Sequence, residues 1–284
     1  MSAIEVISSV KDMQQHSDRI RALGRTIAFV PTMGYLHEGH LALIRKGREL
    51  GDDLVVSIFV NPTQFAPGED FEAYPRDPER DLELIEKEKA DVIFFPDTQE
   101  LYPEGFQTYV ELEKLPKHLC GISRPIFFTG VATVVTKLFN IVKPHFAVFG
   151  EKDYQQLTIV RRMVRDMNFD ITIIGQPTVR EPDGLAMSSR NAYLSPAQRP
   201  AALSLFNALN NADARVKGGI NDAGKIIKEA SDLINSYPDT TIDYISICDP
   251  ETLDDVNTIE TPVLMALAVK VGTTRLIDNM ILKP

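Results

Sequence analysis

The stretch IAFVPTMGYLHEGH, residues 27–40, is the most informative about the fold of this 284-residue chain. An apolar run rich in β-branched and aromatic residues ends in Pro-Thr-Met-Gly, and His37 and His40 then follow three residues apart. Such a run is typical of a strand that is buried on both faces of a parallel sheet. Residues 38–50 have the apolar spacing of a helix. The residues expected to face inward from this helix are Leu41, Leu43, Ile44 and Leu50. The stretch therefore predicts a buried strand, a turn with two histidines, and a helix.

The same alternation of strand and helix continues for two-thirds of the chain. Further strands are predicted at residues 53–60, 91–96, 145–150 and 170–179. Helices are predicted at about 78–89, at 130–144 and at 153–167. Strands that alternate with helices of this length indicate an α/β fold, a Rossmann-like parallel sheet with right-handed crossovers and helices on both faces.

The pattern changes after residue 186. Ser195 is a plausible N-cap with Pro196 at the first helical position, and a second helix is expected at about 222–236. Apolar segments near the C-terminus then predict a few antiparallel strands. We therefore expect a catalytic domain over residues 1–186 and a smaller α+β domain over residues 187–284.

Composition narrows the classes of function. The formal net charge is −10 and the pI is near 5.1, which argues against a general nucleic-acid binder but leaves room for a local anion site. The N-terminal stretch MSAIEVISSVKDMQQHSDRI is amphipathic and lacks a signal-peptide apolar region, and no run reaches the roughly 20 residues that span a bilayer. With only Cys120 and Cys248, the chain is expected to be a reduced, soluble cytoplasmic protein without partners among membranes or nucleic acids.

Polar and charged residues, interspersed with glycine, proline and methionine, gather just after the predicted strands, where parallel sheets bind ligands. They are Pro31, Thr32, Met33, Gly34, His37 and His40 after the first strand, Asn61 and Gln64 after the second, Gly150, Glu151, Lys152, Asp153, Gln155 and Gln156 after the fourth, and Arg180, Asp183, Gly184, Met187, Ser188, Ser189 and Arg190 after the fifth. This convergence carries more weight than any single motif.

Each cluster has a functional and a structural interpretation. His37 and His40 at a helix start suit phosphate oxygens, but a structural pair or a metal site is an alternative, with zinc disfavoured because no third ligand is evident. Lys152 lies two residues beyond an apolar strand, although a lone lysine is more often a surface charge. The Ser188–Arg190 segment suits a phosphate clamp or an ordinary loop. Asn61, Gln64 and Gln156 suit a small polar substrate, although any one amide is more often a loop cap.

Six motifs in order resemble one known family. They are PTMGYLHEGH, SIFVNPTQF, YPRD, GVATVVTKLFNIV, FGEKDYQQ and DGLAMSSRNAYLS. Together they are similar to the pantoate–β-alanine ligase family, within the HxGH nucleotidyltransferase superfamily. The resemblance covers essentially the whole chain and implies a two-step reaction. ATP adenylates the carboxylate of (R)-pantoate with release of pyrophosphate, and β-alanine then attacks the acyl group to give pantothenate and AMP.

The resemblance also implies site residues. Its ATP site would comprise Met33, Gly34, Tyr35, Leu36, His37, Glu38, Gly39, His40, Gly150, Glu151, Lys152, Asp153, Val179, Met187, Ser188, Ser189 and Arg190. His37, His40 and Lys152 would be the catalytic residues, with His40 the residue usually assigned as proton donor. Gln64, Gln156, Asn61 and Met33 would bind pantoate or β-alanine. The family further implies Mg²⁺ with ATP, here near Asp81, and a homodimer.

One departure and two rival functions accompany the resemblance. Phe127 stands where the family often has histidine, while Arg124 is retained. The first rival is another adenylyl or cytidylyl transferase on the same fold, from which Gln64 and Gln156 distinguish a pantoate ligase. The second is a non-catalytic ATP-binding regulatory module, which would show no turnover with the three substrates.

Overall fold

The computed structural model describes residues 4–284; residues 1–3, where the predicted amphipathic N-terminal stretch begins, lie outside it. The described part of the chain divides into two compact units. The first comprises the N-terminal segment up to Glu113, Arg124–Glu151 and Ile159–Pro177. The second comprises Lys114–Ser123, Lys152–Thr158 and Thr178–Pro284, so it includes residues on the N-terminal side of the 186/187 boundary expected from the sequence.

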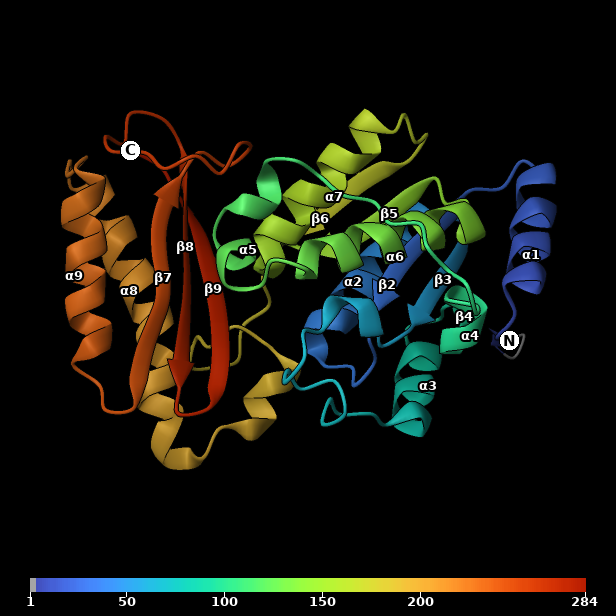
Figure 1. Cartoon of the computed structure of the whole chain (residues 1–284), viewed down its shortest axis with the longest axis horizontal. Helices are drawn as coiled ribbons and strands as arrows, with labels where there is room; N and C mark the ends of the chain where they lie inside the picture. Colours follow the sequence, from blue (N-terminus) through green and yellow to red (C-terminus); the bar gives the residue numbers. More distant parts are fainter. Residues whose placement is uncertain (1–3) are drawn as a thin grey trace. The chain divides into compact units, whose positions relative to one another are not determined.

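The first unit is built on a six-stranded parallel sheet, as predicted from the alternating pattern (Figure 1). The strands are β1 (Glu5–Ile7), β2 (Ile27–Thr32), β3 (Asp53–Ile58), β4 (Val92–Phe94), β5 (Phe146–Gly150) and β6 (Thr172–Gln176). Their spatial order is β1-β4-β3-β2-β5-β6. The chain runs from β2 to β3 and β4 in one direction and returns through β5 and β6 in the other. The order therefore reverses between β2 and β5, which is where sheets of this kind bind ligands.

The helices follow from the same crossover rule. The longer ones are α1 (Val10–Ala22), α2 (Glu38–Leu50), α3 (Pro78–Lys87), α6 (Phe127–Val142) and α7 (Tyr154–Asp166), and α4 (Thr98–Leu101) and α5 (Cys120–Ser123) are single turns. Right-handed crossovers in opposite directions place helices on opposite faces of the sheet. One core joins α2 and α3 to the sheet, with Ile44, Leu54, Ile85 and Ile93 fully buried. No described helix is long and apolar enough to cross a membrane.

One detail of the sheet differs from the sequence prediction. Five strands were expected in the sheet, but the three-residue β1 adds a sixth by pairing with β4. So short a strand carries too few residues to show a period. Helix α1 follows, and its buried His16 is bonded through Nε2 to Asp53 of β3 at 2.9 Å. The inward face expected for α2 is found: Leu41, Leu43 and Ile44 are buried, and Leu50, partly exposed at the last position, packs against the same core.

The second unit has its own core and sheet, the smaller α+β part that was predicted (Figure 1). Strands β7 (Thr240–Cys248), β8 (Val263–Val271) and β9 (Thr274–Leu282) are antiparallel, with β8 in the centre. Helices α8 (Arg199–Lys217) and α9 (Ala223–Asn235) pack with this sheet in one apolar cluster. The Ser195 cap precedes a 3-10 turn at Pro196–Gln198, and the α-helix itself begins only at Arg199. Pro200 has no N–H to donate to the Pro196 carbonyl, so the first turn closes with shorter bonds.

Candidate functional site

The turn after β2 is held by a buried carboxylate. Gly34 and Tyr35 both have positive φ, 80° and 50°, so the chain turns sharply between β2 and α2. Asp81, only 1% exposed, accepts the Tyr35 N–H at 2.6 Å and the Leu36 N–H at 2.7 Å. A Cβ at Gly34 would lie 3.0 Å from a carboxylate oxygen of Asp81. The position thus requires glycine both for its φ and for its close approach to the acid.

His37 and His40 form the first turn of α2. His37 is the N-cap, and its Nδ1 accepts the Gly39 N–H at 3.1 Å, while Nδ1 of His40 accepts the His37 N–H at 3.3 Å. The two ring centroids lie 4.1 Å apart. Because a backbone N–H donates to each Nδ1, the neutral rings carry their own proton on Nε2. Two stacked imidazoles with Nε2–H donors at a helix N-terminus are a suitable site for an anion.

Asn61 and Gln64 are coupled after β3. Asn61 is 1% exposed; its Nδ2 donates to Gln64 Oε1 and to the Gly130 carbonyl, each at 3.1 Å. Its Oδ1 accepts the hydroxyls of Thr63 and Tyr102, both at 2.9 Å. These bonds use the full capacity of the amide, so Asn61 acts on a ligand through Gln64.

The amide of Gln64 is oriented by this contact. Because its Oε1 faces the Asn61 donor, its Nε2 is turned the other way and donates to Met33 Sδ at 3.0 Å. An amide N–H₂ held beside a thioether at the end of a central strand is a suitable donor for a carboxylate or hydroxyl oxygen. The residues predicted after the first two strands, Met33 and Gln64, are therefore brought together.

Two glycines shape the same edge of the first unit. A Cβ at Gly130 of α6 would lie 2.4 Å from the Thr63 carbonyl oxygen, so only glycine lets this helix meet the 61–64 turn. At Gly150, the last residue of β5, a Cβ would meet nothing within 4 Å. Neither neighbouring protein atoms nor a positive φ require glycine there. Its missing side chain leaves open space at the sheet edge beside the β2–β5 reversal point.

The second unit carries Lys152 and two adjacent glutamines. Lys152 lies in the 3-10 turn Glu151–Asp153, and its carbonyl oxygen accepts Asn279 Nδ2 at 2.8 Å. Gln155 is buried and is bonded to the backbone of Leu115, His118 and Cys120. Gln156 is half-exposed. The structure thus distinguishes Gln155, which is used by the protein backbone, from the half-exposed Gln156. The sequence Gln-Gln alone does not make this distinction.

The predicted phosphate loop follows a short hairpin in the second unit. Met187 N–H donates to the Val179 carbonyl at 3.0 Å, so these two predicted ATP residues face each other at the base of the hairpin. Ser188 caps the 3-10 turn Ser189–Tyr193, and its Oγ accepts the Arg190 N–H at 3.2 Å. Residues 188–190 therefore lie at the start of a capped turn.

Asp81 does not fit the role of a magnesium ligand. Both of its oxygens accept backbone N–H groups, and metal binding would have to break those bonds in a carboxylate that is 1% exposed. Burial raises the pKa of this carboxyl above its usual value, although the two N–H bonds act in the opposite direction. Within residues 4–284, no group of three or more His, Cys, Asp or Glu side chains is arranged to hold a metal ion.

Phe127, the departure from the family pattern, begins α6 and supports an ion pair. The Arg124 guanidinium lies 3.9 Å from its ring centroid, donates twice to Glu69 at 2.6 Å, and donates to the Gln64 carbonyl at 3.2 Å. Burial would raise the pKa of Glu69, but the Arg124 bonds outweigh it and hold that pKa below its usual value. Phe127 therefore packs against the Arg124 guanidinium, which in turn binds the Gln64 carbonyl.

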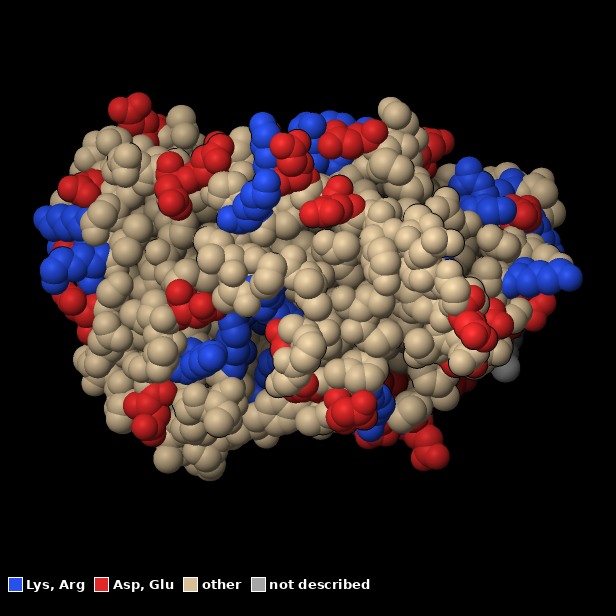
Figure 2. Space-filling view, viewed as in Figure 1, with Lys and Arg blue, Asp and Glu red and all other residues tan. Residues whose placement is uncertain are grey.

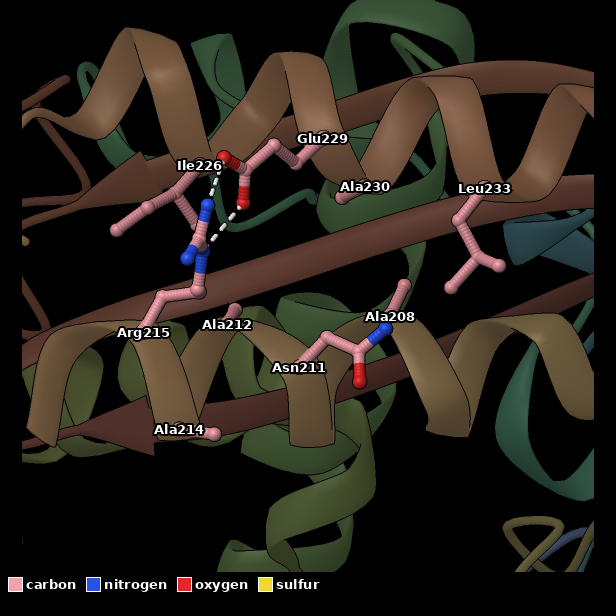
Figure 3. Close-up of a pocket in the computed structure, with 9 residues that line it drawn as sticks. All are labelled: Ala208, Asn211, Ala212, Ala214, Arg215, Ile226, Glu229, Ala230 and Leu233. Atoms are coloured by element: carbon pink, nitrogen blue, oxygen red, sulfur yellow. Dashed lines mark hydrogen bonds and ion pairs between the residues drawn. The ribbon is translucent and has the colours of Figure 1, made fainter. Parts of the chain in front are cut away.

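Other surface features lie apart from the predicted residues. A pocket between α8 and α9 is lined by small and apolar side chains and crossed by the Arg215–Glu229 ion pair (Figure 3). It contains none of the residues singled out from the sequence. On the face shown in Figure 2, acidic and basic side chains are interspersed.

Several residues with a direct bearing on the site were missed from the sequence. The resemblance places Mg²⁺ near Asp81, whereas this carboxylate holds the Tyr35–Leu36 turn, and the sequence predicts no role for Tyr102, Asp278 or Asn279. A signal existed only for the last two, because Asp-Asn interrupts the otherwise apolar segment LIDNMIL of a buried strand. Tyr102 lies in a short segment without periodicity, so nothing in the sequence connects it to Asn61.

Comparison with known proteins gives one consistent result. A family model described as Pantoate-beta-alanine ligase matches residues 5–281. The pantothenate synthetases of Desulfatibacillum aliphaticivorans and Syntrophobacter fumaroxidans are 60% and 57% identical, each covering 99% of this chain and 100% and 99% of the relative. The crystal structure of pantothenate synthetase from Thermus thermophilus superposes with a TM-score of 0.94 at 43% identity, covering 99% of this chain and 100% of that one. Pantoate-beta-alanine ligase from Francisella tularensis, complexed with beta-gamma ATP and beta-alanine, has a TM-score of 0.83 at 34% identity, with 98% of both chains covered.

Proposed function

The chain belongs to the pantoate-beta-alanine ligase family, and from this premise we propose how its own residues carry out the reaction. It is a ligase that condenses pantoate with β-alanine. We propose that the carboxylate of (R)-pantoate attacks the α-phosphorus of ATP, so that a P–O bond forms and the bond to pyrophosphate breaks. The β-alanine amine then attacks the acyl carbon, AMP leaves, and the amine loses a proton as pantothenate forms.

The observation that carries this assignment is the histidine pair. Both Nδ1 atoms accept backbone N–H groups, which places the N–H donors of both rings on Nε2 at the N-terminus of α2. Donors fixed in this way stabilise charge that develops on the triphosphate as pyrophosphate leaves, without reorganising during the reaction. We assign His37 and His40 to the phosphates and His40 to proton donation, with Lys152 as a further cation on the phosphate oxygens.

The remaining ATP residues follow the predicted set. We propose that Met33–His40, Gly150–Asp153, Val179 and Met187–Arg190 bind the nucleotide. The open space at the Gly150 Cβ position supports close approach of a ligand to that strand end. Ser188 Oγ, already committed to the Arg190 N–H, supports a role in shaping the turn that presents Arg190.

Pantoate and β-alanine are assigned to the amides. We propose that the Nε2 of Gln64, oriented by Asn61, donates to pantoate. The half-exposed Gln156 is the second amide, and Met33 provides an apolar contact for the substrate. We place β-alanine next to Gln64 as well. Asn61, whose bonds are all used within the protein, is proposed to act by holding Gln64 in this orientation.

Magnesium, location in the cell and assembly complete the proposal. A Mg²⁺ ion that accompanied ATP would supply charge neutralisation at the triphosphate, and Asp81, whose oxygens both accept backbone N–H groups, does not fit as its ligand. The two cysteines are buried free thiols, with the pKa of Cys248 raised by burial to about 12, in keeping with a reduced cytoplasm. We also propose a homodimer, which sedimentation of the purified protein would test.

We also propose a separate role for each of the two predicted domains. We assign residues 1–186 to binding of ATP and pantoate and residues 187–284 to a lid that excludes water from the adenylate, since acyl adenylates hydrolyse readily. The separate apolar core of α8, α9 and the β7–β9 sheet supports an independently folded lid. Hydrogen exchange with and without a non-hydrolysable adenylate analogue measures the expected protection of residues 187–190.

The function is tested by omitting substrates in turn. AMP release should require ATP, pantoate and β-alanine together, whereas exchange of labelled pyrophosphate into ATP should require pantoate but not β-alanine. Exchange that ignores pantoate, or that is supported only by unrelated acids, would contradict the proposed adenylate. Absence of both activities in the purified protein would favour a binding module over an enzyme.

A further inference from the structure

Two adjacent residues of β9 each hold a segment that the proposed function assigns to ATP. Asp278 is 3% exposed, and its carboxylate accepts two hydrogen bonds from the Arg180 guanidinium, at 2.6 and 3.0 Å. Asn279 donates through Nδ2 to the carbonyl oxygen of Lys152 at 2.8 Å. A buried carboxylate is costly unless it is paired, and the Arg180 guanidinium supplies the pair here.

Arg180 sets the position of the hairpin that precedes the phosphate loop. Its guanidinium also donates to the Gly184 carbonyl at 3.1 Å and lies 4.5 Å from the Phe206 ring centroid. Its backbone pairs with Ala186 in an antiparallel bridge. One residue further toward the base, Met187 meets Val179, and the chain then enters residues 188–190. The point at which the phosphate loop leaves the hairpin therefore depends on where Arg180 is anchored.

Asn279 acts on the other segment through the backbone. The carbonyl that it binds belongs to Lys152, in the single 3-10 turn that leads into α7. Fixing that peptide fixes the direction in which the Lys152 side chain leaves the main chain. A one-turn helix has few bonds of its own, so an external donor contributes much of its definition.

The strand itself is rigidly held. Asp278 and Asn279 pair with Leu267 and Ala266 of the central strand β8, which are 0% and 5% exposed. Successive residues of a strand point to opposite faces, so neighbouring positions can reach two separate segments. One dipeptide thereby contacts Arg180, 98 residues away from Asp278, and Lys152, 127 residues away from Asn279.

We propose that Asp278 and Asn279 are positioning residues that fix Lys152 and the Ser188–Arg190 loop at a set spacing within the second unit. The cationic groups for the triphosphate are then preassembled before the nucleotide arrives. The inference rests on the proposed function, because it takes Lys152 and residues 188–190 to bind ATP. Neither β9 residue touches the substrate in this scheme; each acts through the segment it holds.

The test uses isosteric variants of the full chain. Asp278→Asn removes the charge opposite Arg180, and Asn279→Asp removes the donor to the Lys152 carbonyl. Each should raise the KM for ATP by about 10- to 100-fold, by analogy with the effect of removing a residue that orients a metal ligand, while the KM for β-alanine stays within about twofold. Asp243→Asn is the matched control, since Asp243 forms an ion pair with Arg275 of β9 but holds neither segment.

The outcomes separate this inference from the function on which it rests. Wild-type protein that lacks pantoate-dependent pyrophosphate exchange contradicts the proposed function. Wild-type activity together with unchanged KM for ATP in both variants contradicts the positioning role alone. A merely structural role lowers the thermal midpoint and the amount of active enzyme in all three variants but leaves the KM of the surviving enzyme unchanged. If Asp278→Asn does not fold, Asn279→Asp still decides the question.

Discussion

Replacing Gly130 by alanine tests whether contact between α6 and the 61–64 turn sets the pantoate site. The added Cβ would lie 2.4 Å from the Thr63 carbonyl oxygen, 2.6 Å from its carbon and 2.7 Å from the Gln64 nitrogen. All three are backbone atoms, so no side-chain rotation can relieve the contact. Real Cβ contacts are essentially never shorter than 3.0 Å, so the helix and the turn must separate by at least 0.6 Å, the difference between 3.0 and 2.4 Å.

Two opposing terms determine the effect of Gly130→Ala on stability. Alanine stabilises a helix interior by about 1 kcal/mol relative to glycine. Overpacking of this kind costs roughly 1–3 kcal/mol, and immovable backbone atoms favour the upper part of that range. We therefore expect a net loss of about 1–2 kcal/mol in the free energy of unfolding, measured by urea denaturation.

The effect of Gly130→Ala on activity should fall on one substrate. The Gly130 carbonyl accepts Asn61 Nδ2, and Asn61 in turn orients Gln64, so displacement of the turn moves the proposed pantoate donor. A misplacement near 1 Å can cost about 100-fold in rate, so a shift of about 0.6 Å should reduce kcat/KM for pantoate roughly tenfold. The KM for ATP should change much less.

The control for Gly130→Ala lies in the same helix. Asn140 is exposed near the end of α6, so Asn140→Ala adds helix propensity without a contact and should leave both stability and pantoate kinetics near wild type. The reasoning is refuted if Gly130→Ala is as stable as the wild type and has unchanged pantoate kinetics. That result would mean that α6 can move away from the turn without disturbing Asn61 or Gln64.

Three other predictions use different parts of the molecule. His40→Asn retains an acceptor near Nδ1 but lacks the Nε2 donor, so it should keep the wild-type thermal midpoint while turnover falls about 10²–10⁴-fold. His40→Gln retains a donor near Nε2 but lacks the acceptor, so it should lower the thermal midpoint and keep more of the turnover. Thermal melting and AMP release, measured on both variants, check this. The pKa of Asp81 is raised by burial, so its proton is held more tightly in the folded state and its contribution to stability falls as the pH rises from about 3.8 through the folded pKa. Urea titrations should therefore find the stability of Asp81→Asn relative to wild type improving across that window, and a constant difference would contradict it. Gly184→Ala should lose more stability than Gly24→Ala, because both have positive φ, costing about 1–2 kcal/mol, but only at Gly184 does the Cβ meet the Phe206 ring, at 2.2 Å; equal losses would contradict the contact.

The relation between sequence and structure differs for the fold and for the site. The apolar run before His37 and the alternation that follows predict a parallel sheet with its ligand edge; β2 lies within the quoted stretch, and α2 has the expected bounds, residues 38–50. Period and turn chemistry are local properties, so a single sequence carries them. Strand β1 is not predicted from the sequence, because three residues are too few to show a hydrophobic period.

What the sequence could not decide was which polar side chain faces a ligand and which faces the protein. Asp81 proved to hold the Tyr35–Leu36 turn across 45 and 46 residues, and Asn279 to hold Lys152 across 127. Asn61 is saturated by protein partners, while its neighbour Gln64 is left oriented toward Met33. Such partnerships depend on the register of strands and the packing of helices that are distant in sequence. The residue types therefore determined the chemistry available at the sheet edge, and only the tertiary structure decided which of those groups perform it.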